Sequence, residues 1–238
     1  MATQIKAEHL EQLYKMLEHL KDNEDDYLLI LEKLVYLLVE YLDYESASTL
    51  SFEPKQVTKE FVELVNKKTV QAFTADKIEE AMDVIGRVAE LLKREETKRI
   101  YMNQEELDEA KILTLNNICC IHRKMNKYDI AIRVIDLAIS LEERLAKMDY
   151  GFAKVSIIST YLNKCALCSE RNRNKEAAEA ALKGLKAIDE AEKKRDIGAD
   201  EQEHLQRLRI LCNYHLGVEY EKLNEKSKAL SYIETAIK

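Results

Sequence analysis

Residues that interrupt helices are scarce in this sequence. Proline occurs once among its 238 residues, glycine occurs five times, and tryptophan does not occur. Apolar residues make up 46% of the chain, which is too much for a disordered protein, and charged residues make up 34%. Because helix breakers are nearly absent while Leu, Ala, Glu and Lys are abundant, the composition predicts long helices.

A secretory signal and a membrane span are also lacking. The first residues, MATQIKAEHLEQ, contain no apolar core segment. The most apolar run, YLLILEKLVYLLVEYL at 27–42, is shorter than a membrane span and contains Glu32, Lys33 and Glu40. The five cysteines lie within helical patterns without a regular framework, which indicates reduced thiols. We therefore expect a cytoplasmic protein with no membrane insertion.

The sequence has no clustered basic segment of the kind that nucleic-acid binding requires, so we expect no nucleic-acid partner. The net charge is −7, and residues 1–53 hold 4 Lys/Arg against 12 Asp/Glu, while the remainder holds 33 against 32. The acidic front is open to two interpretations. A solvated acidic face is favoured over a surface that meets a basic partner.

Polar clusters divide the chain into helical segments. Each cluster carries Asn, Asp or Ser, which we expect to cap helices, and Pro54 suits the first turn of a helix. We therefore expect about ten helices in about five hairpins. No segment shows the alternation of apolar and polar residues that is typical of a strand. The clusters are KDNEDD (21–26), SFEP (51–54), TADK (74–77), MNQEE (102–106), MNKYD (125–129), MDYG (148–151), RNRNK (171–175), IGADE (197–201) and LNEKS (223–227).

The first two helical segments carry apolar residues at nearly heptad spacing, from Leu10 to Tyr41, broken at Glu24. A dimeric coiled coil is one interpretation of this spacing. The second segment, however, is apolar almost all round, with Leu28, Val35 and further apolar residues off the heptad positions. Such a helix needs burial on several sides, so a helical array is the favoured interpretation.

Three later segments, 116–139, 163–185 and 214–237, align as repeats of one helical hairpin. Small residues recur where the two helices of each hairpin approach closely, and larger residues recur beside them. The second helix opens with Ala131, Ala177 or Ala229, and a small residue, Cys119, Cys165 or Gly217, lies twelve positions earlier. A weaker copy at 62–92 supplies Ala81, Ile85 and Val88. Its register is open, because Lys68 falls where a Leu is expected.

This pattern resembles the tetratricopeptide repeat (TPR), most clearly in LGVEYEKLNEKSKALSYIETAI at the end of the chain. The opening alanines are 50, 46 and 52 residues apart, against about 34 in the ordinary repeat, so the helices are longer than usual. The sequence therefore looks most like the extended repeats of kinesin light chains. The resemblance implies an all-α, right-handed solenoid. An acidic helical segment at 1–53 would precede TPR-like repeats over 54–238, divided as 54–100, 104–147, 151–195 and 200–238.

The resemblance to this family implies a non-enzymatic adaptor. In the family, the first helix of each hairpin lines a concave groove, which receives an extended or helical peptide of a partner protein. Asn117 and Asn163 occupy equivalent positions on the first helices of adjacent repeats. The resemblance implies that an Asn amide at this position holds the backbone of the bound peptide through both its donor and its acceptor. Repeats that bind chaperone C-termini clamp a carboxylate with Lys and Arg, and the corresponding positions here hold Asn116, Asn163, Leu211 and His215. Only Arg123 and Lys124 are basic nearby, so we expect no chaperone binding. The predicted groove residues are Asn116, Asn117, Arg123, Lys124, Leu162, Asn163, Tyr214 and His215.

Three patterns suggest chemistry, and each has a more ordinary interpretation. Cys165 and Cys168 form a C-x-x-C in the middle of a helix, where no second pair completes a zinc site and small core residues are expected. Glu201 and His204 form a single E-x-x-H, whereas a di-iron bundle needs two. His122 falls on a hairpin seam. We predict no enzyme activity, no metal site and no cofactor.

A second function remains open, that of a fixed structural subunit of a cytoskeletal or ciliary assembly. The sequence SYIETAIK completes a second helix, and a polar closing helix does not follow it. Ile233, Ala236 and Ile237 are therefore expected to lie open to a neighbour. Self-association through this end or through the apolar front helices is the corresponding expectation, and the protein would then be associated with the cytoskeleton or a cilium.

Overall fold

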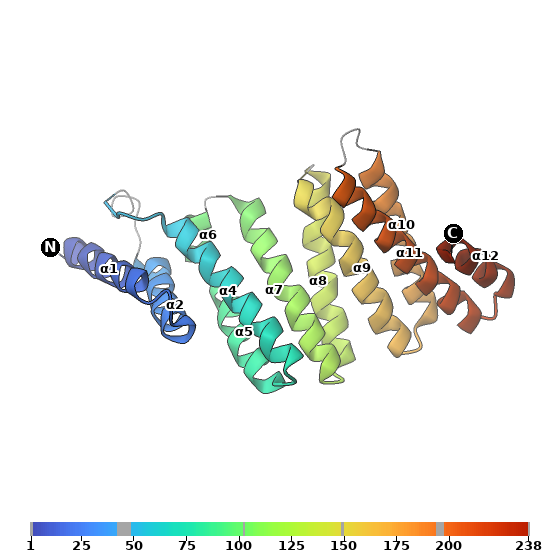
Figure 1. Ribbon diagram of the computed structural model, residues 1–238, viewed down its shortest axis with the longest axis horizontal. Coiled ribbons are helices and arrows are strands. Elements are labelled where there is room, and N and C mark those ends of the chain that lie inside the picture. Colours follow the sequence, from blue (N-terminus) through green and yellow to red (C-terminus); the bar gives the residue numbers. More distant parts are fainter. Residues whose placement is uncertain (1, 42–48, 102, 149, 194–197, 238) are drawn as a thin grey trace. The chain divides into compact units, whose positions relative to one another are not determined.

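The computed structural model describes residues 2–41, 49–101, 103–148, 150–193 and 198–237, and these residues form eleven helices and no strand (Figure 1). The chain divides into two compact units, Met1–Asn117 and Ile118–Lys238. The helical content and the approximate number of helices match the prediction. The boundary between an acidic segment and repeats at 53/54, and the four repeat ranges, stay predictions.

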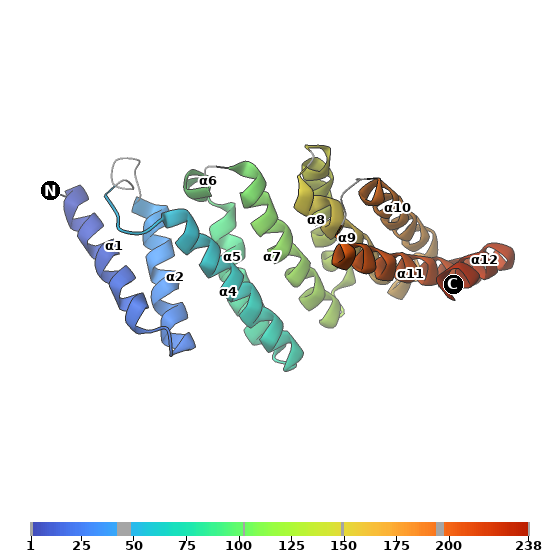
Figure 2. The same ribbon diagram turned by 45° about the horizontal axis from the view of Figure 1, so that its top comes forward.

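Unit 1 contains α1 (Ala2–His19), α2 (Glu24–Tyr41), α4 (Pro54–Thr74), α5 (Ile78–Lys93), α6 (Glu95–Tyr101) and the first part of α7 (Gln104–Lys124). The helices α1 and α2 pack side by side as an antiparallel pair, which Figure 2 shows, and α2 also packs against α4. Their apolar side chains enter one core with α4 and α5. The core includes Leu10, Leu13, Leu17, Leu31, Leu34, Leu38, Phe61, Val65, Val88 and Leu91.

The burial of α2 decides between the two interpretations of the front of the chain. Leu31, Leu34 and Val35 are fully buried within unit 1, and Leu28 is partly buried against the same core. The near-heptad residues thus pack within one chain, as expected for a helical array. On the outer side of α2, Leu29 remains 62% exposed.

The short helix α6 was not predicted. It follows α5 after a single extended residue, Arg94, whose ψ of 138° ends the helix without any glycine or proline. The hydroxyl of Thr97 donates a hydrogen bond to the carbonyl of Leu91 at 2.6 Å, which satisfies one of the acceptors left at the end of α5. Thr97 and Tyr101 are buried, so α6 closes this end of the unit 1 core.

Unit 2 contains the end of α7, α8 (Tyr128–Lys147), α9 (Gly151–Glu170), α10 (Asn174–Glu192), α11 (Ala199–Lys222) and α12 (Lys226–Ile237). The helix α9 packs against both α8 and α10, and α11 packs against α9, α10 and α12 (Figure 1). Two apolar clusters hold these helices together, one around Ala131, Ile135, Cys165 and Ala177, the other around Ile158, Ile188 and Leu205.

The aligned small residues lie in the seams between paired helices, as predicted. All four opening alanines are buried, and so are the small residues twelve positions before them, including Gly217. A Cβ atom on Gly217 would lie 2.5 Å from two carbons of Ile233, closer than carbon atoms approach. In the weak copy, Thr69 and Ala72 are buried twelve and nine residues before the buried Ala81, which agrees with the register aligned at 62–92.

The polar residues between paired helices act differently from the prediction. Asp76, Asn126, Asn172 and Asn224 adopt positive φ of 56–63° and end the preceding helix instead of capping the next one. The backbone N–H of the residue after each of them donates to the carbonyl five residues earlier, as from Lys127 to the carbonyl of His122 at 2.9 Å. The expected N-cap role occurs at Asn103, whose side-chain oxygen accepts from the backbone N–H of Glu105 at 2.8 Å.

Candidate recognition face

Of the eight residues predicted to line a groove, Asn116 and Asn117 lie on α7 within unit 1. Asn116 donates from Nδ2 to the carbonyl of Ile112 in its own helix at 3.1 Å. The Nδ2 of Asn117 donates to Oδ1 of Asn66 on α4 at 2.6 Å, and the buried Asn66 in turn donates to Thr114 at 3.3 Å. One N–H of the Asn117 amide is therefore committed inside unit 1.

In unit 2, charged side chains link the first helices of successive hairpins. The Nε of Arg123, near the end of α7, donates to both carboxylate oxygens of Glu170 on α9 at 3.0 and 3.1 Å. Between α9 and α11, Ser169 donates to Oε1 of Glu219 at 2.6 Å, and Lys222 donates to the same oxygen at 2.9 Å. These pairs hold the side chains in fixed positions, and a side chain fixed in advance loses less entropy when a ligand binds.

His215 lies on α11 within reach of these charges. Burial lowers the pKa of its imidazole, the positive charges of Lys222 and Arg123 lower it further, and Glu219 opposes them. The imidazole is therefore neutral at physiological pH and offers one donor and one acceptor. Its ring meets the ring of Tyr214 edge-on, with 5.8 Å between the centroids.

Apolar and amide groups lie beside the charged links. On α11, Leu211 is 46% exposed and Tyr214 is 52% exposed. On α9, Leu162 is partly buried against the core, and the side-chain amide of Asn163 is half-buried without a hydrogen bond to the described residues. Lys124 is exposed at the end of α7. We call the following set the recognition face: Arg123, Lys124, Leu162, Asn163, Leu211, Tyr214 and His215.

Sequence reasoning missed Glu219, which is fully buried at the edge of this face. Its Oε1 is the acceptor that joins Ser169 to Lys222, while its Oε2 accepts no hydrogen bond from the described residues. The spacing of three residues between Glu219 and Lys222 indicates an ion pair on one helix. The burial depends on α9, so no local pattern predicts it.

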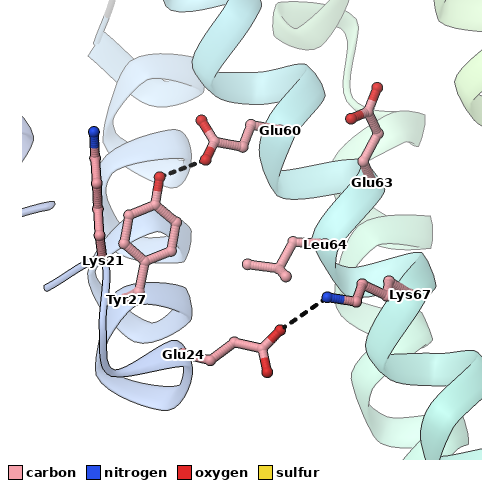
Figure 3. A pocket seen from close by; sticks show the side chains of 7 residues that line it. All are labelled: Lys21, Glu24, Tyr27, Glu60, Glu63, Leu64 and Lys67. Carbon is pink, nitrogen blue, oxygen red and sulfur yellow. Dashed lines mark hydrogen bonds and ion pairs between the residues drawn. The ribbon is translucent and has the colours of Figure 1, made fainter. Parts of the chain in front are cut away.

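A cleft of about 590 Å³ lies in unit 1 between the α1–α2 turn and α4 (Figure 3). Tyr27 donates from its hydroxyl to Glu60 across the cleft, and Lys67 pairs with Glu24 at 3.5 Å. Burial and then the Glu60 carboxylate raise the pKa of Tyr27 above its usual range. Figure 3 shows these two pairs on either side of Leu64, with Lys21 beside Tyr27. Because these polar groups bind one another, we assign the cleft no ligand.

Among the residues that suggested chemistry, the two cysteines are core residues and the Glu–His pair is on the surface. Cys165 and Cys168 are buried in the unit 2 core, and burial raises the pKa of Cys165 to about 12, so its thiol stays protonated. Glu201 and His204 are exposed on α11. Burial lowers the pKa of the half-buried His122. No group of three metal-ligating side chains occurs among the described residues, and none of the helices described is long and apolar enough to cross a membrane.

Comparison with known proteins finds no matching family model and no matching curated protein. Among solved structures 16 chains match. One of them is the crystal structure of BtubC (BKLC) from P. vanneervenii, with 14% identity, a TM-score of 0.55, and coverage of 99% of this chain and 90% of that chain. BtubC is kinesin light chain-like, and the likeness shows the fold alone. The chain thus has an all-α, TPR-like fold of helical hairpins, consistent with an α-solenoid.

Proposed function

We propose that this protein is a non-enzymatic adaptor, which binds an extended or helical segment of a partner protein across the recognition face of unit 2. The observation that carries the proposal is that α9, which bears the half-buried and unpaired amide of Asn163, packs against α11, on which Leu211 and Tyr214 are exposed. Exposed apolar side chains beside polar groups that are already fixed in place are typical of protein-binding surfaces. The TPR-like fold supports the same function by analogy.

Each part of the face has a role in this mechanism. The amide of Asn163 donates to a backbone carbonyl of the partner and accepts from a backbone N–H. Leu211 and Tyr214 cover an apolar side chain of the partner and remove it from water. The Arg123–Glu170 pair frames this contact and disfavours a partner with an unmatched charge at that place.

The test is affinity capture from the native cell with quantification of the bound partner. The variants Asn163→Ala and Tyr214→Ala are expected to reduce the captured partner at least about tenfold, as for residues at the centre of an interface. The control variant is Leu137→Ala, which removes an apolar side chain that is 57% exposed on α8, outside the face. Circular dichroism checks that all three variants stay helical. Equal capture by the face variants and the control would refute the proposal.

A second function, docking within a larger assembly, is favoured by one observation on α12. Leu230 is 61% exposed and Ile237 is 81% exposed, seven residues apart on the same side of this helix. We propose sedimentation of the isolated chain at increasing concentration as the test. An assembly subunit is expected to self-associate, and the double variant Leu230→Glu/Ile237→Glu to abolish it. A monomer at every concentration contradicts self-association through α12.

We propose a cytoplasmic location with association to the cytoskeleton or a cilium, which the kinesin light chain-like neighbour supports by analogy only. Imaging of a fluorescent fusion tests it. A diffuse distribution of fluorescence that does not change when microtubules are depolymerised would contradict the cytoskeletal association. It would leave the proposed adaptor function intact.

A further inference from the structure

One side of α12 repeats the pattern of apolar residues found on α8. Each of these helices has an opening alanine, Ala131 in α8 and Ala229 in α12, and the positions that follow hold residues of the same kind. Because equal offsets fall on the same side of a helix, the surface that α8 offers to its neighbours has a counterpart on α12. One, four and eight residues after the alanine, α8 has Ile132, Ile135 and Ile139, and α12 has Leu230, Ile233 and Ile237.

On α8, this side is covered by another helix of unit 2. The helix α9 packs against α8 (Figure 1), and Ile132 and Ile139 are only 6% and 7% exposed. Ile139 belongs to one apolar cluster with Ile157 of α9. The equivalent residues of α12, Leu230 and Ile237, are 61% and 81% exposed. Among the described residues, the counterpart of the side that α9 covers is therefore open on α12.

A charged position extends the likeness between the two helices. Five residues after its opening alanine, α8 has Asp136, and Lys164 of α9 donates to the Asp136 carboxylate at 2.6 Å. The same position in α12 holds Glu234, which is exposed. Of the contacts that α9 makes with α8, the apolar ones and this ion pair thus have counterparts on α12. We call the following set the α12 face: Leu230, Ile233, Glu234 and Ile237.

We propose that the α12 face binds an amphipathic helix of a partner protein, in the place that α9 occupies on α8. The partner helix has two apolar residues spaced like Ile157 and Tyr161 of α9, followed by a lysine or arginine spaced like Lys164. That cation pairs with Glu234. The site goes beyond the adaptor function of the recognition face. It rests on the second function proposed above, docking through α12, and it names the occupant.

A helix from another protein suits the α12 face better than a second copy of this chain. The helix of this chain that fits such a face is α9, and α9 already packs against α8 and α10 within its own unit. Ile158 and Cys165 of α9 are fully buried there. A second copy would have to unfold unit 2 to offer its α9, whereas a free helix of another protein binds without this cost.

The probe is a fluorescein-labelled peptide with the sequence of residues 151–170, in which both cysteines are replaced by alanine and Glu170 by Gln. Glu170 is replaced because its ion-pair partner Arg123 has exposed Glu221 as its equivalent on α11. Fluorescence anisotropy measures binding of the probe to the full chain. We expect saturable binding, because the probe buries the apolar residues of the α12 face.

The variant Leu230→Glu/Ile237→Glu tests the apolar part of the face. We expect it to weaken probe binding at least about tenfold, because it places two charges at the centre of the contact. The matched control, Ser231→Glu/Thr235→Glu, adds the same two charges to α12 at positions whose equivalents on α8 stay exposed beside α9. It is expected to change the affinity less than about twofold. Circular dichroism verifies that both variants stay helical.

Charge reversal tests the ion pair. The variant Glu234→Lys is expected to weaken binding of the probe about threefold, as for an exposed ion pair. A second probe with Lys164→Glu should bind the wild type about threefold more weakly and regain affinity on Glu234→Lys. Damage to the fold of α12 would weaken binding of both probes, so only a direct contact between the two positions predicts this rescue.

Three results would overturn the proposal. The first is equal affinity of Leu230→Glu/Ile237→Glu and the wild type for the probe. The second is weak binding of the Lys164→Glu probe to Glu234→Lys, without rescue. The third is self-association of the wild type that Leu230→Glu/Ile237→Glu abolishes. The occupant would then be a second copy, and docking through α12 would stand. The adaptor function is tested separately, by capture on the recognition face, and none of these results bears on it.

Discussion

A buried carboxylate in unit 2 makes the stability of the protein depend on pH. Glu142 lies on α8 with no exposed surface. Its Oε1 accepts from the hydroxyls of Ser156 at 2.7 Å and Thr160 at 3.1 Å, both on α9, and its Oε2 accepts no hydrogen bond from the described residues. Burial raises the pKa of Glu142 from its ordinary 4.5 to about 7, although the two hydroxyl hydrogen bonds act in the opposite direction.

The sign of the effect follows from this raised pKa. The folded state holds the proton of Glu142 more tightly than the unfolded state does, so folding is favoured most below pH 4.5. As pH rises from 4.5 through about 7, the unfolded state loses the proton first and the free energy of unfolding falls. At ~1.4 kcal/mol per pKa unit, the total loss is about 3 kcal/mol.

The variant Glu142→Gln tests this reasoning. An amide has nearly the size of the protonated carboxyl group and accepts the same two hydroxyl hydrogen bonds, but it never ionises. We expect its free energy of unfolding to match the wild type near pH 4.5 and to exceed it by about 3 kcal/mol at pH 8. Urea unfolding followed by circular dichroism at both pH values measures the difference, in which the titration of all other groups cancels.

The matched control is Glu143→Gln, because this neighbouring side chain is 41% exposed. Its substitution is expected to change the free energy of unfolding by less than about 1 kcal/mol at either pH. A difference between Glu142→Gln and the wild type that is the same at both pH values would refute the argument, since the carboxyl group would then not change its protonation between them.

Three further predictions concern packing, turns and thiols. Gly86→Ala is expected to stabilise the protein by about 0.5–1 kcal/mol, because the added Cβ meets no atom within 4 Å. Gly217→Ala should destabilise it by about 1 kcal/mol, because the added Cβ collides with Ile233. Thermal unfolding compares the two variants. Asn126→Val, at a φ of 58°, is expected to cost about 1–2 kcal/mol in the same assay, while Asn126→Gly should cost nothing. The buried thiols, protonated because burial raises their pKa, should react with a thiol reagent at pH 8 only after unfolding, and reaction at the rate of a free thiol contradicts this.

The residues at the hairpin seams were predictable because two closely packed helices leave room only for small side chains where they meet. Ala131, Ala177 and Gly217 lie where the alignment placed them, since a larger side chain there collides with the partner helix. The helix α6 escaped prediction because its only boundary is the backbone conformation of Arg94, which no residue type marks.

The turn residues illustrate an ambiguity that composition alone leaves open. Asn and Asp favour both N-caps and the left-handed conformation at the end of a helix. The regular offset of five residues between Asn126 and Ala131, or between Asp76 and Ala81, separates the two roles, because it ties each polar residue to the end of the preceding helix.

The candidate site was only partly predictable. Alignment places Asn117 and Asn163 at equivalent positions, yet Asn117 donates to Asn66, which lies 51 residues away, while Asn163 has no such partner among the described residues. Contacts between helices far apart in the sequence thus decide which amide remains available for a ligand. The burial of Glu219 by Ser169 depends on tertiary packing in the same way.

Photo-crosslinking in the native cell tests the central claim, partner binding at the recognition face, most directly. A photoreactive phenylalanine analogue replaces Tyr214 in one variant and Leu182, which is 37% exposed on α10, in another. Our account predicts a discrete crosslinked protein from position 214 that is absent at position 182 and is lost when Asn163→Ala is added. The same crosslinked products from both positions, or none from position 214, would contradict it.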